Sequence, residues 1–252
     1  MTLAVPARAK LNLDLEVLSR GSDGFHQIRT RIQSVALHDL LELEPAEGRT
    51  TLKTTGLAQI EEKDNSVMKA HAALERAMGR ELPTRFHLHK RIPPGAGLGG
   101  ASSDAAAALR GLRTVHQLKV DLEEIAAGVG ADVPFFLNGG TALAEGRGER
   151  LTRLPPESGW FAIAWPGIEL LTSAVYRAWD EVQGDGPNQL TQAATRVAPQ
   201  LQDFAKQLGD GWQMTGSGSA FFRRAADRSA ATKAAADRDC WTSITYAVGA
   251  WV

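Results

Sequence analysis

The chain has 252 residues, of which 43% are hydrophobic and 23% charged, and its formal net charge is −1. These proportions are typical of a globular protein and exclude a disordered, collagen-like or coiled-coil chain. The charge is balanced along the chain, because residues 1–140 carry 17 basic and 17 acidic side chains and residues 141–252 carry 11 and 12. Since neither part is basic, we expect no nucleic-acid partner.

Cysteine content and hydropathy indicate where the protein works. The single cysteine, Cys240, has no partner for an internal disulfide, which fits a reducing cytoplasm. The chain has no apolar run of about 18 residues, and charged residues follow its start too early for a signal peptide. We therefore expect a soluble, cytoplasmic protein with no membrane partner, either a monomer or a weak homodimer.

The first part of the chain predicts mostly strands. Strands are predicted over residues 11–17, 27–37, 40–44, 50–54 and 85–92. In the last of these, Phe86 and Leu88 fall on one face, with Lys90 as a further candidate for that face. Between the last two strands, Asn65 is placed to cap a helix over residues 67–78.

The rest of the chain mixes both element types. Helices are predicted over 105–118, 122–127, 173–182, 188–208 and 227–236, and strands over 141–144, 150–154, 161–165, near 213, over 220–223 and over 242–248. This order has no regular βα repeat and predicts an α+β fold. The segment 154–156 (LPP) marks a lobe boundary or a tight connection. Motifs on both sides of it favour two lobes, residues 1–154 and 155–252.

The segment from Gly95 to Gly100 matches G-x-G-x-x-G, a weak signal by itself. A dinucleotide-binding loop needs a hydrophobic strand before it and an acidic residue on the next strand, about 20 residues later. Here two prolines precede the loop, and the acids at that distance, Asp121 and Glu123, begin a helix, which excludes this type of loop. A Walker loop needs a lysine where this chain has Ala101-Ser102, so that type is excluded. A protein-kinase loop continues into a strand, whereas this loop continues into a predicted helix, so that type is excluded too. Glycines at a helix start, with the hydroxyls of Ser102 and Ser103, favour a phosphate site. The alternative is a glycine-rich turn with a serine helix cap.

Four regions of the sequence carry a resemblance to a kinase family. The segment KRIPPGAGLGGASSDAA resembles the phosphate loop of the GHMP small-molecule kinases. Two further regions resemble the 4-diphosphocytidyl-2-C-methyl-D-erythritol kinases, namely PARAKLNLDLEV with DGFHQIRTRIQSV, and GADVPFFLNGGTALAEGRGERL. The segment MTGSGSAFF resembles the third glycine motif of the same family. These matches span nearly the whole chain.

The resemblance implies both a fold and a reaction. The fold would have an N-terminal lobe like domain 2 of ribosomal protein S5 and a ferredoxin-like C-terminal lobe. The reaction would be ATP-dependent phosphorylation of the 2-hydroxyl of 4-diphosphocytidyl-2-C-methyl-D-erythritol, in the non-mevalonate route to isoprenoids. The partner would thus be a small molecule with a cytidine diphosphate group.

The resemblance also implies roles for single residues. Asp132 becomes the catalytic base and Lys10 its charged partner, although the residues alone fit a helix cap and a solvated lysine equally well or better. ATP is expected to contact Asn65, Lys90, Pro93, Pro94, Gly95, Ala96, Gly97, Leu98, Gly99, Gly100, Ala101, Ser102 and Ser103. The substrate is expected to contact Asn12, Phe25, His26, Thr172, Tyr176, Gly216, Ser217 and Gly218.

Several of these residues also have a purely structural interpretation. Without a nucleobase, Phe25 would be a core residue and His26 a surface residue. Tyr176 fits ordinary helix packing, Asn65 needs no nucleotide to cap its helix, and Gly216–Gly218 fits a β-turn.

Two positions depart from the family pattern, and metal ligands are not evident. Phe25 stands where tyrosine is common, which keeps ring stacking but removes the phenol oxygen. Asp104 stands where asparagine is frequent and adds negative charge beside the phosphate site. Mg²⁺ is expected with ATP, but no dense carboxylate cluster marks its ligands. His87 and His89 share a strand face that suits a metal, although an edge-strand surface is the favoured interpretation.

Two other functions stay open at this level. One is a GHMP kinase that acts on a different small alcohol. The other is a nucleotide-binding sensor or adaptor without activity, which the joint presence of Lys10 and Asp132 disfavours.

Overall fold

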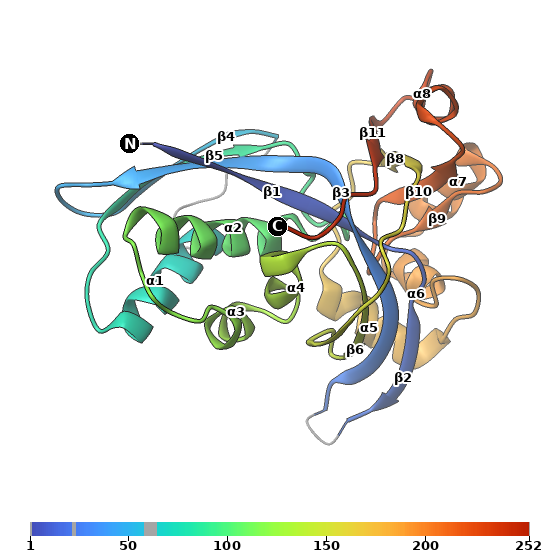
Figure 1. Cartoon of the computed structure of the whole chain (residues 1–252). Coiled ribbons are helices and arrows are strands. Elements are labelled where there is room, and N and C mark those ends of the chain that lie inside the picture. The colour runs from blue at the N-terminus through green and yellow to red at the C-terminus, as the bar shows by residue number, and fades with distance from the viewer. Residues whose placement is uncertain (1, 22–23, 58–64, 252) are drawn as a thin grey trace.

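The computed structural model describes residues 2–21, 24–57 and 65–251 (Figure 1). Its strands are β1 (Leu3–Asn12), β2 (Glu16–Arg20), β3 (His26–Pro45), β4 (Thr51–Gly56), β5 (Thr84–Lys90), β6 (Thr141–Gly146), β7 (Arg150–Arg153), β8 (Trp160–Trp165), β9 (Gln213–Met214), β10 (Phe221–Ala225) and β11 (Trp241–Tyr246). Its helices are α1 (Ser66–Met78), α2 (Gly100–Val115), α3 (Glu123–Val129), α4 (Val133–Asn138), α5 (Thr172–Val182), α6 (Leu190–Val197), α7 (Gln200–Leu208) and α8 (Arg228–Ala235). Within the described ranges, no helix combines the length and apolar character needed to cross a membrane.

The N-terminal lobe is a seven-stranded sheet with helices α1–α4 on one face (Figure 1). The long strand β3 pairs antiparallel with β1, β2, β5 and β6. Along β5 the predicted alternation is confirmed, since Phe86, Leu88 and Lys90 are buried and the residues between them are half-buried. Phe86 and Leu88 join Leu74 of α1 and Leu109 of α2 in the core. Burial of each such side chain contributes about 1.5–3 kcal/mol.

The C-terminal lobe is a four-stranded sheet in the order β11-β8-β10-β9. On one side, apolar residues of α5–α7 pack with Ala164 and Phe221. Phe161, Ile163 and Phe222 belong instead to a core that includes β1 and the glycine loop of the first lobe. The hydrophobic core therefore continues from one lobe into the other, and the glycine loop lies where they meet.

The C-terminal segment returns to the N-terminal lobe beside β1 and α2 (Figure 1). Isolated bridges join Val35 to Ala247 and Gly139 to Ala250. The indole ring of Trp251 lies between two guanidinium groups, with Arg8 at 3.6 Å and Arg110 at 4.0 Å from its centroid. Cation–π contacts of this kind stabilise by about 0.5–2 kcal/mol.

Four predicted elements differ from those observed. The strand predicted over 11–17 is divided between β1 and β2, because the Asp14 carboxylate accepts hydrogen bonds from the Arg31 backbone and side chain where the chain bends. The strands predicted over 27–37 and 40–44 are the single strand β3. The helix predicted over 188–208 is two helices, because Pro199 disfavours helical backbone at Ala198, whose φ is −133° and ψ 89°.

Two local predictions concern capping and the sheet edge. Asn65 caps α1 as predicted, accepting a hydrogen bond from the Val67 N–H at 2.9 Å. The prediction that His87 and His89 lie on an edge strand is wrong. β5 lies inside the sheet, between β4 and β3.

Candidate active site

The glycine loop connects β5 to α2. Positive φ angles occur at Gly95 (58°), Gly97 (76°) and Gly99 (73°). Backbone hydrogen bonds hold the loop from both lobes. The Lys10 N–H in β1 donates to the Leu98 carbonyl, and the Ala220 N–H next to β10 donates to the Ala96 carbonyl, both at 3.0 Å. The loop geometry therefore depends on the contact between the lobes.

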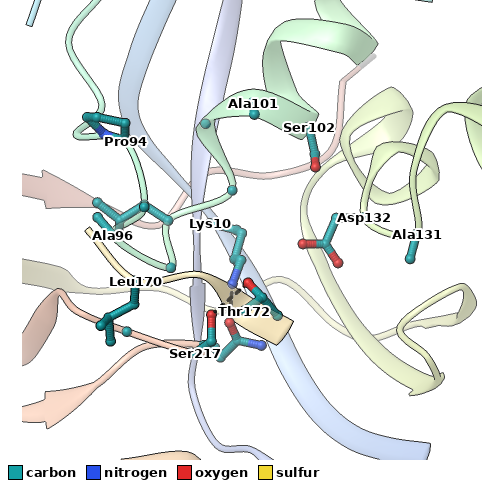
Figure 2. Close-up of a pocket in the computed structure, with 18 of the residues that line it drawn as sticks. Lys10, Pro94, Ala96, Ala101, Ser102, Ala131, Asp132, Leu170, Thr172 and Ser217 are labelled. Carbon is teal, nitrogen blue, oxygen red and sulfur yellow. Dashed lines mark hydrogen bonds between the residues drawn. The ribbon is translucent and has the colours of Figure 1, made fainter. Parts of the chain in front are cut away.

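The N-terminus of α2 is arranged for an anion. Its capping residue is Gly99, and in the described chain no side chain caps the helix. The Ser103 hydroxyl donates to the Gly100 carbonyl at 2.9 Å, so the interpretation that a serine merely caps this helix is wrong. Ser102 points into the space beside the loop (Figure 2). The first-turn N–H groups and the positive end of the helix dipole thus face that space.

A cavity of about 450 Å³ adjoins the loop (Figure 2). Most of the predicted site residues line it, namely Lys10, Asn12, Lys90, Pro93, Pro94, Gly95, Ala96, Gly97, Leu98, Gly99, Gly100, Ala101, Ser102, Asp132, Thr172, Tyr176, Gly216, Ser217 and Gly218. The predicted residues that do not line it are Asn65, Ser103, Phe25 and His26. The cavity has the volume typical of small-molecule sites.

Lys10 and Asn12 enter this cavity from β1. Lys10 is only 7% exposed, so its interpretation as a solvated surface lysine is wrong. Its ammonium group donates to Asn12 Oδ1, while Asn12 Nδ2 donates to Thr30 Oγ1 at 2.9 Å. Burial lowers the pKa of Lys10, whereas the negative charge of Asp132 raises it. A buried cation and a carboxylate therefore act on each other across the cavity.

Asp132 stands immediately before α4, in the position of a helix cap. Its side chain makes no capping hydrogen bond in the described structure, so the cap interpretation is wrong. The carboxylate instead faces the cavity, on the side where Lys10 and Ser102 point (Figure 2). A carboxylate that the fold does not use for capping is available for chemistry on a bound molecule.

Behind the loop lies a buried cluster of charges. Lys90 Nζ donates to Asp39 Oδ2 and, at 2.7 Å, to Asp104 Oδ2. Burial lowers the pKa of Lys90, but the charges and hydrogen bonds of Asp104 and Asp39 outweigh it and raise the pKa overall. Burial raises the pKa of Asp104 well above its usual range, against the opposing effect of Lys90. Asp104 therefore lies behind the cavity wall, paired with a lysine, and adds no bare charge to the phosphate site.

Asp39 also shapes the entry to the glycine loop. Its Oδ1 accepts hydrogen bonds from the backbone N–H groups of Arg91 and Ile92, the latter at 2.8 Å. These residues connect β5 to the loop. One carboxylate thus fixes both the lysine of the cavity wall and the start of the loop.

Of the aromatic residues predicted to contact the substrate, only Tyr176 lines the cavity in the described part of the chain. His26 stacks on Tyr176 with ring centroids 5.4 Å apart and an interplanar angle of 20°. His26 Nε2 is 2.7 Å from Asp180 Oδ1. Burial, then the charge of Asp132, raises the pKa of Tyr176, which stays a neutral phenol. Phe25 is 58% exposed with the Arg147 guanidinium 5.2 Å from its ring centroid. The interpretations of Phe25 as core and His26 as surface are both wrong, because only His26 is buried.

The second glycine turn completes the cavity from the C-terminal lobe. Thr172 Oγ1 and Ser217 Oγ form a hydrogen bond of 3.0 Å. Asn188 Nδ2 donates to the carbonyls of Met214 and Gly216, both at 2.9 Å. A Cβ on Gly216 would lie 2.9 Å from Lys10 Nζ. Gly216 also has a φ of 58°, in the left-handed region that favours glycine.

Asn65 lies apart from the cavity. Its Oδ1 caps α1, and its buried Nδ2 has no hydrogen-bond partner among the described residues. The structural role of Asn65 is confirmed, and its predicted contact with ATP stays a prediction.

Several residues of the site are not predicted from the sequence. The cavity is also lined by Leu15, Ile28, Ala131, Arg147 and Leu170. The apolar members look like any core residue in sequence. Arg147 had a signal, since it lies between Gly146 and Gly148 in a turn of the motif that carries Asp132. Asp39, Asp180 and Asn188 act through contacts distant in sequence, which no local pattern announces.

Comparison with known proteins identifies the family. Residues 65–140 match the model of the GHMP kinases N terminal domain. A 4-diphosphocytidyl-2-C-methyl-D-erythritol kinase of Thermotoga maritima is 36% identical over 243 residues, covering 85% of this chain and 89% of the relative. A relative of the same name from Pelotomaculum thermopropionicum is 36% identical over 270 residues, covering 94% and 93%. The chain belongs to the 4-diphosphocytidyl-2-C-methyl-D-erythritol kinase family.

Solved structures agree with this assignment. A crystal structure of 4-(cytidine 5'-diphospho)-2C-methyl-D-erythritol kinase, 35% identical, matches with a TM-score of 0.81 and covers 98% of this chain and 100% of that one. A mevalonate kinase, 11% identical, shares the fold with a TM-score of 0.69 and covers 98% of this chain and 99% of its own. As a member of this kinase family, the chain has the two-lobe α+β fold and is an ATP-dependent small-molecule kinase. The sensor or adaptor alternative is therefore wrong.

Within this kinase, the contact between the two glycine turns is a first point to test. A Cβ on Gly97 would lie 2.3 Å from the Thr215 carbonyl oxygen, and its φ of 76° strains any L side chain. We expect Gly97→Ala to lower the melting temperature and to weaken ATP binding, since the strain alone costs about 1–2 kcal/mol.

Gly128→Ala is the matched control. Gly128 lies in α3, and its added Cβ would meet nothing within 4 Å. This substitution is expected to stabilise by up to about 1 kcal/mol and to leave ATP binding unchanged. Thermal unfolding and titration with ATP measure both effects. Equal behaviour of the two variants would contradict the role given to Gly97.

Proposed function

We propose that this chain transfers the terminal phosphoryl group of ATP to the 2-hydroxyl of 4-diphosphocytidyl-2-C-methyl-D-erythritol. One observation carries the proposal. Lys10 and Asp132 line the same cavity as the glycine loop, so a hydroxyl group beside Asp132 lies within reach of a phosphate on that loop. The family of the chain supplies the chemical identity of the substrate.

In this proposal the glycine loop holds the triphosphate. Its glycines let the backbone approach the phosphate oxygens, and the N-terminus of α2 places N–H groups and a partial positive charge there. Lys90, only 4% exposed, lines the cavity wall with its ammonium group held by Asp39 and Asp104. The predicted ATP contacts from Pro93 to Ser103 and at Asn65 belong to the same proposal.

Mg²⁺ is the expected companion of ATP. Among the described residues, Asp132 is the only carboxylate that lines the cavity, and the Ser102 hydroxyl faces the same space. These groups fit an ion that is bound mainly by phosphate oxygens and water, as Mg²⁺ commonly is. When bound, the ion neutralises charge on the phosphates.

Asp132 then acts on the acceptor hydroxyl. Its carboxylate accepts the proton that the 2-hydroxyl loses as the hydroxyl oxygen bonds to the terminal phosphorus of ATP, while the bond from that phosphorus to the departing ADP breaks. Lys10 stabilises negative charge on the oxygens that are transferred. Asn12 Oδ1 holds the Lys10 ammonium in place, so that the cation is oriented before the substrate binds.

Tyr176, His26 and Phe25 are proposed to bind the cytidyl moiety. The exposed ring of Phe25 offers a face for a nucleobase, and Tyr176 lines the cavity beside His26. Asp180 fixes the orientation of the His26 ring. Thr172, Ser217 and the neighbouring glycines would contact the erythritol diphosphate.

A direct assay tests the substrate assignment. Purified chain with Mg-ATP should convert 4-diphosphocytidyl-2-C-methyl-D-erythritol to its 2-phosphate. Phosphorus NMR of the product measures this conversion. Homoserine and mevalonate are the matched alternative acceptors, and we expect no turnover with either. Turnover of one of them without turnover of the cytidyl compound would contradict the substrate while leaving the kinase fold intact.

The organisation of the chain completes the proposal. The two lobes are proposed to divide at residues 154 and 155, since β7 ends at Arg153 in the first sheet and β8 begins at Trp160 in the second. We also propose a cytoplasmic enzyme, either a monomer or a weak homodimer. The unpaired Cys240 supports that location.

A further inference from the structure

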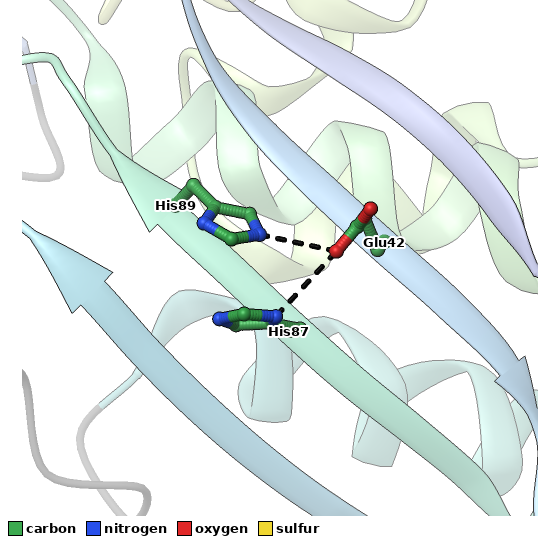
Figure 3. A group of neighbouring side chains, drawn as sticks. All are labelled: Glu42, His87 and His89. Carbon is green, nitrogen blue, oxygen red and sulfur yellow. Dashed lines mark hydrogen bonds and ion pairs between the residues drawn. The ribbon is translucent and has the colours of Figure 1, made fainter.

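A second cluster of polar side chains lies on the sheet face opposite the helices. Glu42 of β3 is the register partner of His87 on β5, and His89 follows two residues later on the same face (Figure 3). All three side chains are half-buried. The alternate residues of β5, Phe86 and Leu88, point into the core, so the cluster lies on the open face of the sheet.

The distances within the cluster suit a single ion. Glu42 Oε2 is 3.1 Å from His89 Nε2 and 3.5 Å from His87 Nδ1. One ligand atom from each residue can be chosen so that all three lie within 4.8 Å of one another. Two ligands at about 2.1 Å from a tetrahedral ion are about 3.4 Å apart. The carboxylate oxygen and both imidazole nitrogens therefore need only small side-chain adjustments to share one ion.

The second nitrogen of each ring is also accounted for. Thr55 Oγ1, on the neighbouring strand β4, is 3.0 Å from His89 Nδ1 and 3.3 Å from His87 Nε2. A hydroxyl oxygen has two lone pairs and can accept from both N–H groups. This arrangement leaves His89 Nε2 and His87 Nδ1 as lone-pair donors on the side of Glu42. Metal-binding histidines typically donate their other N–H in this way.

We propose that Glu42, His87 and His89 form a binding site for one transition-metal ion of the Zn²⁺ type, oriented by Thr55. Two imidazoles and one carboxylate favour such ions over Mg²⁺ and Ca²⁺, which prefer oxygen ligands. The remaining positions of the ion go to water on the open face. Lys53 on β4, the register partner of His87, is a nearby cation that opposes binding and limits the affinity.

The ion would connect β3 to β5 without entering the kinase cavity. Lys90 follows His89 but its side chain is buried on the other face of β5, where it meets Asp39 and Asp104. Occupancy therefore stabilises the N-terminal sheet as any ligand of the folded state does.

Zinc titration of the full untagged chain tests the proposal. After removal of metals by a chelator, calorimetry with ZnCl₂ should show one saturable event. His87→Ala and His89→Ala are each expected to weaken it at least about tenfold. His38→Ala is the matched control, a half-buried histidine on β3 whose Nδ1 lies 2.7 Å from the Ala36 carbonyl, and it should bind zinc like the native chain.

Thr55 gives a second, sharper comparison. Thr55→Val removes the oxygen at nearly constant shape and should weaken zinc about 10- to 100-fold, whereas Thr55→Ser should retain it. A hundredfold excess of zinc over its dissociation constant should raise the melting temperature of the native chain by about 5 °C, and that of His87→Ala much less. No saturable event in the native chain, or unchanged affinity in both histidine variants, would overturn the proposal.

Discussion

Replacing Asp132 with asparagine is expected to lower kcat about 10²- to 10⁴-fold while the chain stays folded. The amide has nearly the shape of the carboxylate but cannot accept the proton of the attacking hydroxyl. The loss corresponds to about 3–5 kcal/mol of transition-state stabilisation. Steady-state kinetics with the cytidyl substrate and Mg-ATP measure it, and titration with ATP should show unchanged binding.

The control for this prediction is another aspartate at a helix start. Asp121 Oδ1 accepts a hydrogen bond of 3.0 Å from the N–H of Glu123, the first residue of α3. Asp121→Asn should leave kcat unchanged, because asparagine can accept the same hydrogen bond. If Asp132→Asn changed stability but not kcat, Asp132 would be a structural residue and the proposed base would have to be sought elsewhere.

Lys10 gives an independent check on the same chemistry. In the proposal, Asp132 and Lys10 act together in one step. The kcat of the double variant Lys10→Met/Asp132→Asn should therefore be no lower than that of the more impaired single variant. Multiplied losses would mean that the two residues act at separate steps. The shared cavity and the effect of the Asp132 charge on the pKa of Lys10 favour the first outcome.

The parts of the site that the sequence could predict are those with local signals. Glycines before an alanine-rich helix indicate an anion site for physical reasons that need no tertiary structure, and the structure places that loop in the cavity wall. From the sequence alone, the role of Asp132 is ambiguous, because a residue before a helix fits a cap equally well. Only the observation that its side chain makes no capping hydrogen bond and faces the cavity separates the two interpretations.

Other features depend on contacts between distant segments. Asp39 looks like one acid in a strand, yet it binds Lys90, 51 residues away, and the backbone at Arg91 and Ile92. β3 is predicted as two strands because the polar pair His38-Asp39 interrupts the apolar pattern, and Asp39 is buried there through its contacts with Lys90 and the backbone after β5. The packing of Trp251 between Arg8 and Arg110 likewise joins opposite ends of the chain.

The buried charges behind the glycine loop make the second large prediction. Lys90→Met should lower the free energy of unfolding by about 3–5 kcal/mol, because it leaves the carboxylates of Asp39 and Asp104 buried without their cation. Both carboxylates are at most 1% exposed, so water cannot replace the ammonium group. The variant should also bind ATP more weakly, since Lys90 lines the cavity. Urea unfolding measures the first effect and ATP titration the second.

Two further variants distinguish this explanation from a general need for lysine. Lys53→Met removes an exposed lysine from the adjacent strand and should change stability by less than about 0.5 kcal/mol.

Asp104→Asn removes one of the two acids and should be nearly neutral or stabilising. Burial already raises the pKa of Asp104, so its charged form is unfavourable, and the Asp39–Lys90 pair remains without it. A large loss of stability in Asp104→Asn, equal to that in Lys90→Met, would mean that both carboxylates are needed as anions. In that case the lysine would balance a net negative charge behind the phosphate site, and ATP binding would strengthen when Asp104 is neutralised.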